Sequence, residues 1–173
     1  MNKSFFSWFL AGGAAILLNC IGNLCEKFFY PIFALPAARL AGFFFNSVPI
    51  FDDKGLIVIP LAASLIQVTP DCSGYGFFCL ITAISVVFYR DVEWRMALIG
   101  RVGLTLLMAY LITIITNGFR IVSAYKVHLI TAKILPASAQ NLAHFIVGIT
   151  IFFTVLLIVY LILTKVTKFT EKY

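Results

Sequence analysis

Long apolar runs with almost no charge are the feature that most constrains how this chain folds. The first, residues 5–24, carries no charged side chain over its whole length, and about 20 apolar residues are enough for a helix to cross a bilayer. The chain is 62% hydrophobic and 12% charged, with a mean hydropathy of +1.03. Soluble domains carry about 25% charged residues. The sequence therefore predicts an all-α integral membrane protein.

The apolar runs predict about four transmembrane helices, with five or six as the alternative count. The four cover residues 5–24, 73–89, 96–119 and 142–163. A short charged segment at 90–95 and a 21-residue loop at 121–141 are predicted to join the last three. At this length we expect a single membrane-embedded domain, residues 1–173.

Residues 28–50 form an apolar segment whose sequence is not typical of a regular transmembrane helix. The segment contains Pro31, Pro36, Pro49 and Arg39. Proline disrupts helix hydrogen bonding, and an arginine near the bilayer centre costs at least about 2.5 to 3.5 kcal/mol on insertion scales. We interpret the segment as interfacial or re-entrant, and the sequence leaves open whether it spans.

Two short segments rich in β-branched residues follow, at 56–59 and 65–69, after a turn at 52–55. Such runs favour extended structure. They predict a short hairpin that leads the chain back to the membrane at Cys72.

Cys72 is the first candidate for chemistry, because the turn Pro70-Asp71 places it at the start of a predicted helix. Backbone N–H groups and the macrodipole at a helix start stabilise a thiolate. Gly74 allows close backbone approach, and the amides of the first turn of this helix are candidate oxyanion donors. Most membrane cysteines are simply small apolar residues, and we interpret the others in that way: Cys20, Cys25 and Cys79.

Arg120 is the second candidate, since a charge at the predicted membrane exit of a helix is costly unless it is paired or functional. Asn117 lies three residues earlier and therefore on the same helix face. A guanidinium can stabilise a thiolate or an oxyanion. The alternative is an arginine that anchors the helix to lipid phosphate.

His144 is the third candidate, two residues into the last predicted helix, with Gly148 one turn further on. An imidazole can take a proton from a thiol and give it to a leaving amine. The alternative is a histidine that hydrogen-bonds across helices. His128, in the predicted loop, is a competing base and ranks lower.

Consecutive crossings place Cys72, Arg120 and His144 on one side of the bilayer. With the N-terminus, the 90–95 segment with the nearby Arg101, and the C-terminal tail in the cytoplasm, seven of the 13 Lys and Arg residues lie inside. The positive-inside rule thus favours an outward-facing site.

Three motifs together resemble those of the exosortase/archaeosortase family of membrane transpeptidases. They are V-T-P-D-C-S-G at 68–74, N-G-F-R-I at 117–121, and His144 with Gly148, and the resemblance covers about residues 55–163. It implies that Cys72 is the nucleophile, Arg120 the electrostatic stabiliser and His144 the proton carrier. Ser73, Gly74, Asn117 and Gly148 would support them. A histidine at 144, where archaeal members tend to have arginine, favours a short bacterial exosortase.

The resemblance also implies partners and a location. The substrate would be an exported protein ending in a short motif, a transmembrane helix and a basic tail. The acceptor would be a lipid or glycolipid-like surface anchor. The enzyme would lie in the bacterial cytoplasmic (inner) membrane, surrounded by membrane lipids, with its site facing the periplasmic side.

The main alternative is a non-catalytic scaffold, assembly factor or transporter-associated protein. A metal-dependent intramembrane protease is disfavoured, because the chain has no His-Glu-x-x-His motif. The cysteines show no metal-ligand spacing, so no metal or other cofactor is expected. Basic residues do not gather on one face, which argues against nucleic-acid binding.

Overall fold

The computed structural model describes residues 12–170 except 14, 18, 23, 63 and 90–97. Its helices are α2 (Glu26–Phe45), α3 (Tyr75–Tyr89), α4 (Leu98–Thr131) and α5 (Ala137–Thr170). A 3₁₀ turn, η1 (Pro70–Cys72), follows three strands, β1 (Ile50–Phe51), β2 (Ile57–Pro60) and β3 (Leu65–Val68).

Three helical segments are long and apolar enough to cross a membrane: Lys27–Phe45, Val102–Thr131 and Leu142–Lys165. The segment Tyr75–Phe88 is a shorter apolar helix. The prediction of an all-α membrane protein with a short extended element is confirmed. Much of the predicted first helix, 5–24, lies outside the described residues, and the described residues within 12–22 are helical.

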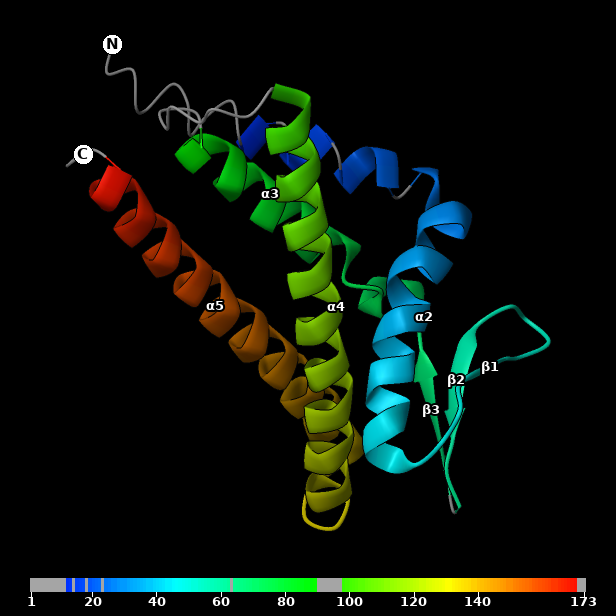
Figure 1. The fold of residues 1–173 in the computed structure, drawn as a ribbon. Helices are drawn as coiled ribbons and strands as arrows, with labels where there is room; N and C mark the ends of the chain where they lie inside the picture. The colour runs from blue at the N-terminus through cyan, green and yellow to red at the C-terminus, as the bar shows by residue number, and fades with distance from the viewer. Residues whose placement is uncertain are drawn as a thin grey trace.

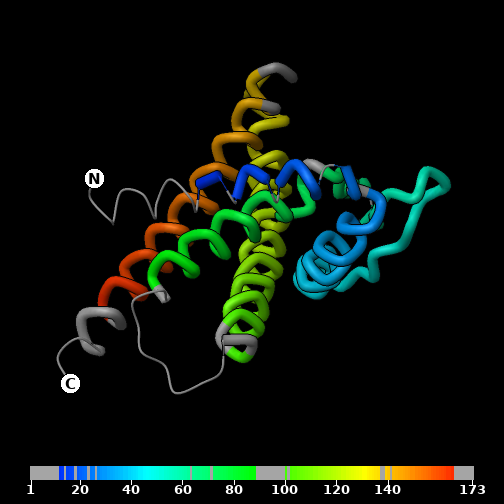
Figure 2. The backbone as a smooth tube through the Cα atoms, turned by 90° about the horizontal axis from the view of Figure 1, so that it is seen from above, coloured from blue at the N-terminus to red at the C-terminus, as the bar shows by residue number. Residues whose placement is uncertain are grey.

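Helix α4 lies at the centre of the molecule, with α2 on one side and α5 on the other (Figures 1 and 2). It packs against α2, α3 and α5. The small sheet lies against α2, on the side of the molecule away from α5 (Figure 1). Every element that carries a candidate residue therefore meets the middle of α4 or its C-terminal half.

Residues 28–50 differ from prediction, because α2 is one continuous 20-residue helix that includes Pro31 and Pro36. Pro36 cannot donate to the carbonyl of Ile32, and the Tyr110 hydroxyl of α4 donates to that carbonyl instead, at 2.9 Å. Neighbouring elements thus satisfy a group that the proline leaves open, as is common in membrane helices. The segment was interpreted as interfacial or re-entrant, with a span left open; its helix has the length and composition of a span.

Small residues let α2 pack closely. Four alanines on it are completely buried in a cluster with Ile57 and Ile59 of β2 and Ile121 of α4: Ala34, Ala37, Ala38 and Ala41. Close approach of helices through small side chains is the usual basis of association in membranes. The helix ends at Asn46, whose left-handed φ of 48° stops it.

The predicted loop at 121–141 is wrong, because α4 continues to Thr131 and α5 begins at Ala137. No Gly or Pro interrupts residues 121–131, and the first helix breaker is Pro136. At 1.5 Å per residue, α4 is about 51 Å long, well beyond the roughly 30 Å hydrocarbon core. The candidate span Val102–Thr131 alone is about 45 Å long, so an untilted α4 extends past the hydrocarbon core.

The predicted hairpin is confirmed and gains a strand, because β1, β2 and β3 form an antiparallel sheet in that order. The buried Tyr30 of α2 ties the sheet to the helix. Its hydroxyl accepts from the Ile57 amide at 2.7 Å and donates to the Val68 carbonyl at 2.6 Å. The chain that leaves β3 toward Cys72 is thereby held against α2.

Candidate functional site

Cys72 lies at the end of the 3₁₀ turn, three residues before α3 begins at Tyr75. The Cys72 amide donates to the Thr69 carbonyl and the Ser73 amide to the Pro70 carbonyl, each at 2.9 Å. The predicted start of this helix at Ser73 is thus two residues early. The amide of Ser73, in the predicted first turn, already has an acceptor. It is therefore not a free oxyanion donor, contrary to the prediction.

Asn117 of α4 holds the turn in place. It is fully buried, and its Nδ2 donates to the carbonyl of Cys72 at 2.7 Å and to that of Ser73 at 3.0 Å. Gly74 has a φ of +87°, and a Cβ there would lie 3.2 Å from Cγ2 of Thr113. The left-handed φ favours a glycine here, and the missing side chain also lets the turn lie close to α4.

Arg120 joins this anchor to the thiol. Its Nη2 lies 3.4 Å from Sγ of Cys72, and its Nη1 lies 3.4 Å from Oδ1 of Asn117. One guanidinium therefore contacts the sulfur and the side chain that fixes the cysteine backbone. The planar fork of arginine suits two such contacts, whereas a lysine ammonium has no equivalent geometry.

Helix α5 supports the other face of the guanidinium. Cζ of Arg120 lies 5.1 Å from the ring centroid of Phe152, which is cation–π range. The Phe152 ring stacks in turn on Phe77 of α3, with centroids 4.5 Å apart. Gly148 provides the space, since a Cβ there would lie 2.8 Å from Nε of Arg120. The sequence did not indicate Phe152, because a phenylalanine among 18 in an apolar chain gives no signal.

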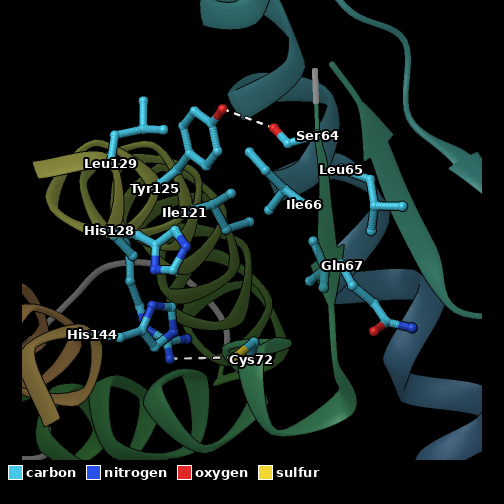
Figure 3. Close-up of a pocket in the computed structure, with 13 residues that line it drawn as sticks. Ser64, Leu65, Ile66, Gln67, Cys72, Ile121, Tyr125, His128, Leu129 and His144 are labelled. Carbon is cyan, nitrogen blue, oxygen red and sulfur yellow. Dashed lines mark hydrogen bonds between the residues drawn. The ribbon is translucent and has the colours of Figure 1, made fainter. Parts of the chain in front are cut away.

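Cys72, Arg120 and His144 line one pocket of about 300 Å³, between β3 and the C-terminal half of α4. Figure 3 shows Cys72 and His144 at the same end of this pocket, with the His128 ring beside that of His144. His144 lies in the third turn of α5 rather than two residues from its start. The structure thus places all three predicted residues together.

His128 also lines the pocket, because it belongs to α4 and not to a loop. Its lower rank rested on that predicted loop. The spacing of Arg120, Ala124 and His128, four residues apart each, was the signal that could have placed them on one helix face.

The four cysteines are free thiols; Cys72 is half-buried, Cys79 is buried, and Cys20 and Cys25 are exposed. Within the described ranges, no group of three or more His, Cys, Asp or Glu side chains is arranged to hold a metal ion.

Comparison with known proteins shows which protein family the chain belongs to. Residues 4–161 match the family described as transmembrane exosortase. No curated protein and no solved structure matches the chain. The matched region includes the predicted first helix, the sheet, and every element that lines the pocket, and it extends further toward the N-terminus than the motifs alone suggested. The chain belongs to the transmembrane exosortase family.

Proposed function

We propose that this protein is a membrane cysteine transpeptidase that cleaves a C-terminal sorting signal of an exported protein. Cleavage would proceed through a thioester at Cys72, followed by transfer of the protein to a cell-surface anchor. The observation that carries the proposal is the 3.4 Å contact between Nη2 of Arg120 and Sγ of Cys72, beside His144 in one pocket. A cation against a thiol favours the thiolate, which is the nucleophilic form.

In the first step, Sγ of Cys72 attacks the carbonyl carbon of the scissile peptide, and His144 accepts the thiol proton. The resulting oxyanion faces Arg120, whose donors are preorganised by Asn117 and Phe152. The C–N bond then breaks, and His144 gives the proton to the leaving amine. The acyl part of the substrate remains as a thioester on Cys72, and the membrane tail departs.

In the second step, an amine-bearing lipid or glycolipid-like anchor, or water, attacks the thioester carbonyl. The new amide or acid forms, the C–S bond breaks, and the thiol of Cys72 is restored. Because a substrate helix and the enzyme share the bilayer, confinement supplies much of the required proximity.

The location of the site follows from the same proposal. Arg120 lies about one hydrocarbon thickness along α4, at the level where a peptide adjoining a membrane helix would emerge. We place the protein in the bacterial cytoplasmic membrane with this end toward the periplasmic side, in agreement with the distribution of Lys and Arg.

Thiol labelling tests the proposal on the purified full chain in lipid nanodiscs. Iodoacetamide is applied at neutral pH, and the labelled cysteine is located by mass spectrometry. We expect Cys72 to react faster than the exposed Cys20 and Cys25, and Arg120→Ala to slow Cys72 by about tenfold or more, because a hydrogen bond to a charged group is lost.

Lys126→Ala is the matched control, because it removes an exposed cation of the same helix away from Cys72; its rate should match the native chain. Equal labelling of Cys72 with and without Arg120 would contradict the proposal and favour the non-catalytic scaffold.

A further inference from the structure

The pocket runs along the edge of the small sheet. Five consecutive residues line it, 64–68, which include all of β3. Side chains alternate between the two faces of a strand, so a cavity beneath one face would meet every second residue. Contact with an unbroken run means that the pocket follows the strand backbone.

The register of the sheet leaves polar backbone groups on this edge. The Leu61 amide donates to the Ser64 carbonyl at 2.9 Å, so residues 61 and 64 form a hydrogen-bonded pair. In the antiparallel pattern such pairs alternate, which makes Ile66–Ile59 and Val68–Ile57 the next ones. The Tyr30 hydroxyl bridges the last of these.

It follows that Leu65 and Gln67 direct their N–H and C=O groups away from β2. β3 is the terminal strand of the described sheet, and no described strand pairs with that side. Unpaired backbone groups at a strand edge are a template for another strand. Here the template opens onto a pocket whose facing wall on α4 is mixed. Its apolar residues are Ile121, Ala124 and Leu129, and its polar residues are Arg120, Tyr125 and His128.

The two ends of the groove differ. At one end lie Cys72, Arg120 and His144; at the other, the hydroxyls of Ser64 and Tyr125 are hydrogen-bonded across it at 3.0 Å. Four strand residues span about 13 Å. The groove therefore has room for about four residues of extended peptide that end at the thiol.

We infer that the recognition motif of the substrate binds as an added strand along the free edge of β3, which delivers the scissile bond to Cys72. The inference rests on the proposed function and deepens it. The occupant is an extended peptide of about four residues that lies between β3 and the wall formed by Ile121, Ala124 and Leu129. Backbone hydrogen bonds to Leu65 and Gln67 supply the alignment, as in other strand-addition complexes.

Peptide chloromethyl ketones test this on the full chain in nanodiscs. A pooled library of N-acetylated tetrapeptide ketones with varied uncharged side chains is compared with N-acetylglycine chloromethyl ketone. In each reagent, Sγ of Cys72 displaces chloride and forms a thioether, which mass spectrometry quantifies. Rates are divided by the iodoacetamide rate of the same sample. We expect the library to react at least tenfold faster than the short reagent.

N-methylation of alternate peptide amides is the matched control. Methyl groups on the amides that face β3 should remove about fivefold or more of the acceleration, because each lost hydrogen bond weakens binding. Methyl groups on the other alternate set should retain it. Gln67→Pro removes an N–H that points away from β2, and an edge strand tolerates proline at such a position. This variant should lower the normalised library rate as well.

The outcomes separate the two proposals. If iodoacetamide labels Cys72 at the same rate in the native chain and in Arg120→Ala, the proposed function fails. If that labelling behaves as expected but the library reacts no faster than the short ketone, the strand-addition inference is overturned. If both methylation patterns reduce the library rate of the native chain equally, the inference is also overturned. This comparison does not require any variant to fold.

Discussion

The two longest helices, α4 and α5, are equal in length at 34 residues but differ in what they bury. α4 carries four buried polar side chains: Thr105, Thr113, Thr116 and Asn117. α5 exposes most of its span, and its outward side chains are large and apolar, such as Phe153 at 64% exposed. Both have the hydropathy of a membrane span.

The difference teaches that position in the bundle, rather than composition, decides which helix carries the site. α4 lies between α2 and α5 (Figure 2), so Thr113 and Asn117 find partners inside the protein. Thr113 donates to the Ala109 carbonyl at 2.8 Å, and Asn117 donates to two carbonyls of the cysteine turn. α5 contributes to the site through His144, Gly148 and Phe152, which lie in its N-terminal half.

Asn117→Ala is expected to have the largest effect on stability, and it tests whether the buried polar groups of α4 matter more than the exposed face of α5. The change leaves two carbonyls unsatisfied and opens a cavity, so we expect the free energy of unfolding to fall by about 3 kcal/mol. Unfolding in mixed micelles, followed by circular dichroism, measures it.

Thr154→Ala on α5 is the control for Asn117→Ala, because Thr154 is exposed and bonds only its own helix, at Thr150. It should change stability by less than about 0.5 kcal/mol. A similar loss for both variants would contradict the contrast between the helices.

Gly148→Ala is expected to have an intermediate effect, on the labelling rate of Cys72. It tests whether α5 helps to position Arg120. The added Cβ would lie 2.8 Å from Nε of Arg120 and must displace the guanidinium. Iodoacetamide labelling of Cys72 should slow by about tenfold, the loss of one charge-assisted contact.

Gly103→Ala is the matched glycine control, because a Cβ at that position of α4 meets nothing within 4 Å. Its labelling rate should equal that of the native chain. Unchanged labelling in Gly148→Ala would show that this glycine does not serve the arginine.

The smallest effect is expected from Phe153→Ala on the exposed face of α5. Lipid tails are as apolar as the side chain, so its loss there removes little net stabilisation. We expect a change in unfolding free energy below about 0.5 kcal/mol, measured as for Asn117→Ala. A loss above about 2 kcal/mol would mean that another protein surface covers this face.

Several features of the fold could be predicted because their signals are local. Apolar length indicated the spanning helices at 96–119 and 142–163, although not their ends, and β-branched runs indicated the hairpin. The ends were missed because polar residues such as Lys126 and His128 resemble a loop, whereas they belong to α4. The continuity of α2 was missed because the compensation for Pro36 comes from Tyr110, 74 positions away in the chain.

The sequence by itself determined that this is a helical membrane protein and which polar residues stand out in it, because hydropathy and spacing are properties of neighbouring residues. Tertiary structure decided that Arg120 contacts Cys72 and Asn117 at once, that Phe152 lies beneath the guanidinium, and that a free strand edge borders the pocket. Those relations join residues from four elements, η1, β3, α4 and α5, and only the packing of the helices and the sheet brings them within a few ångströms of one another.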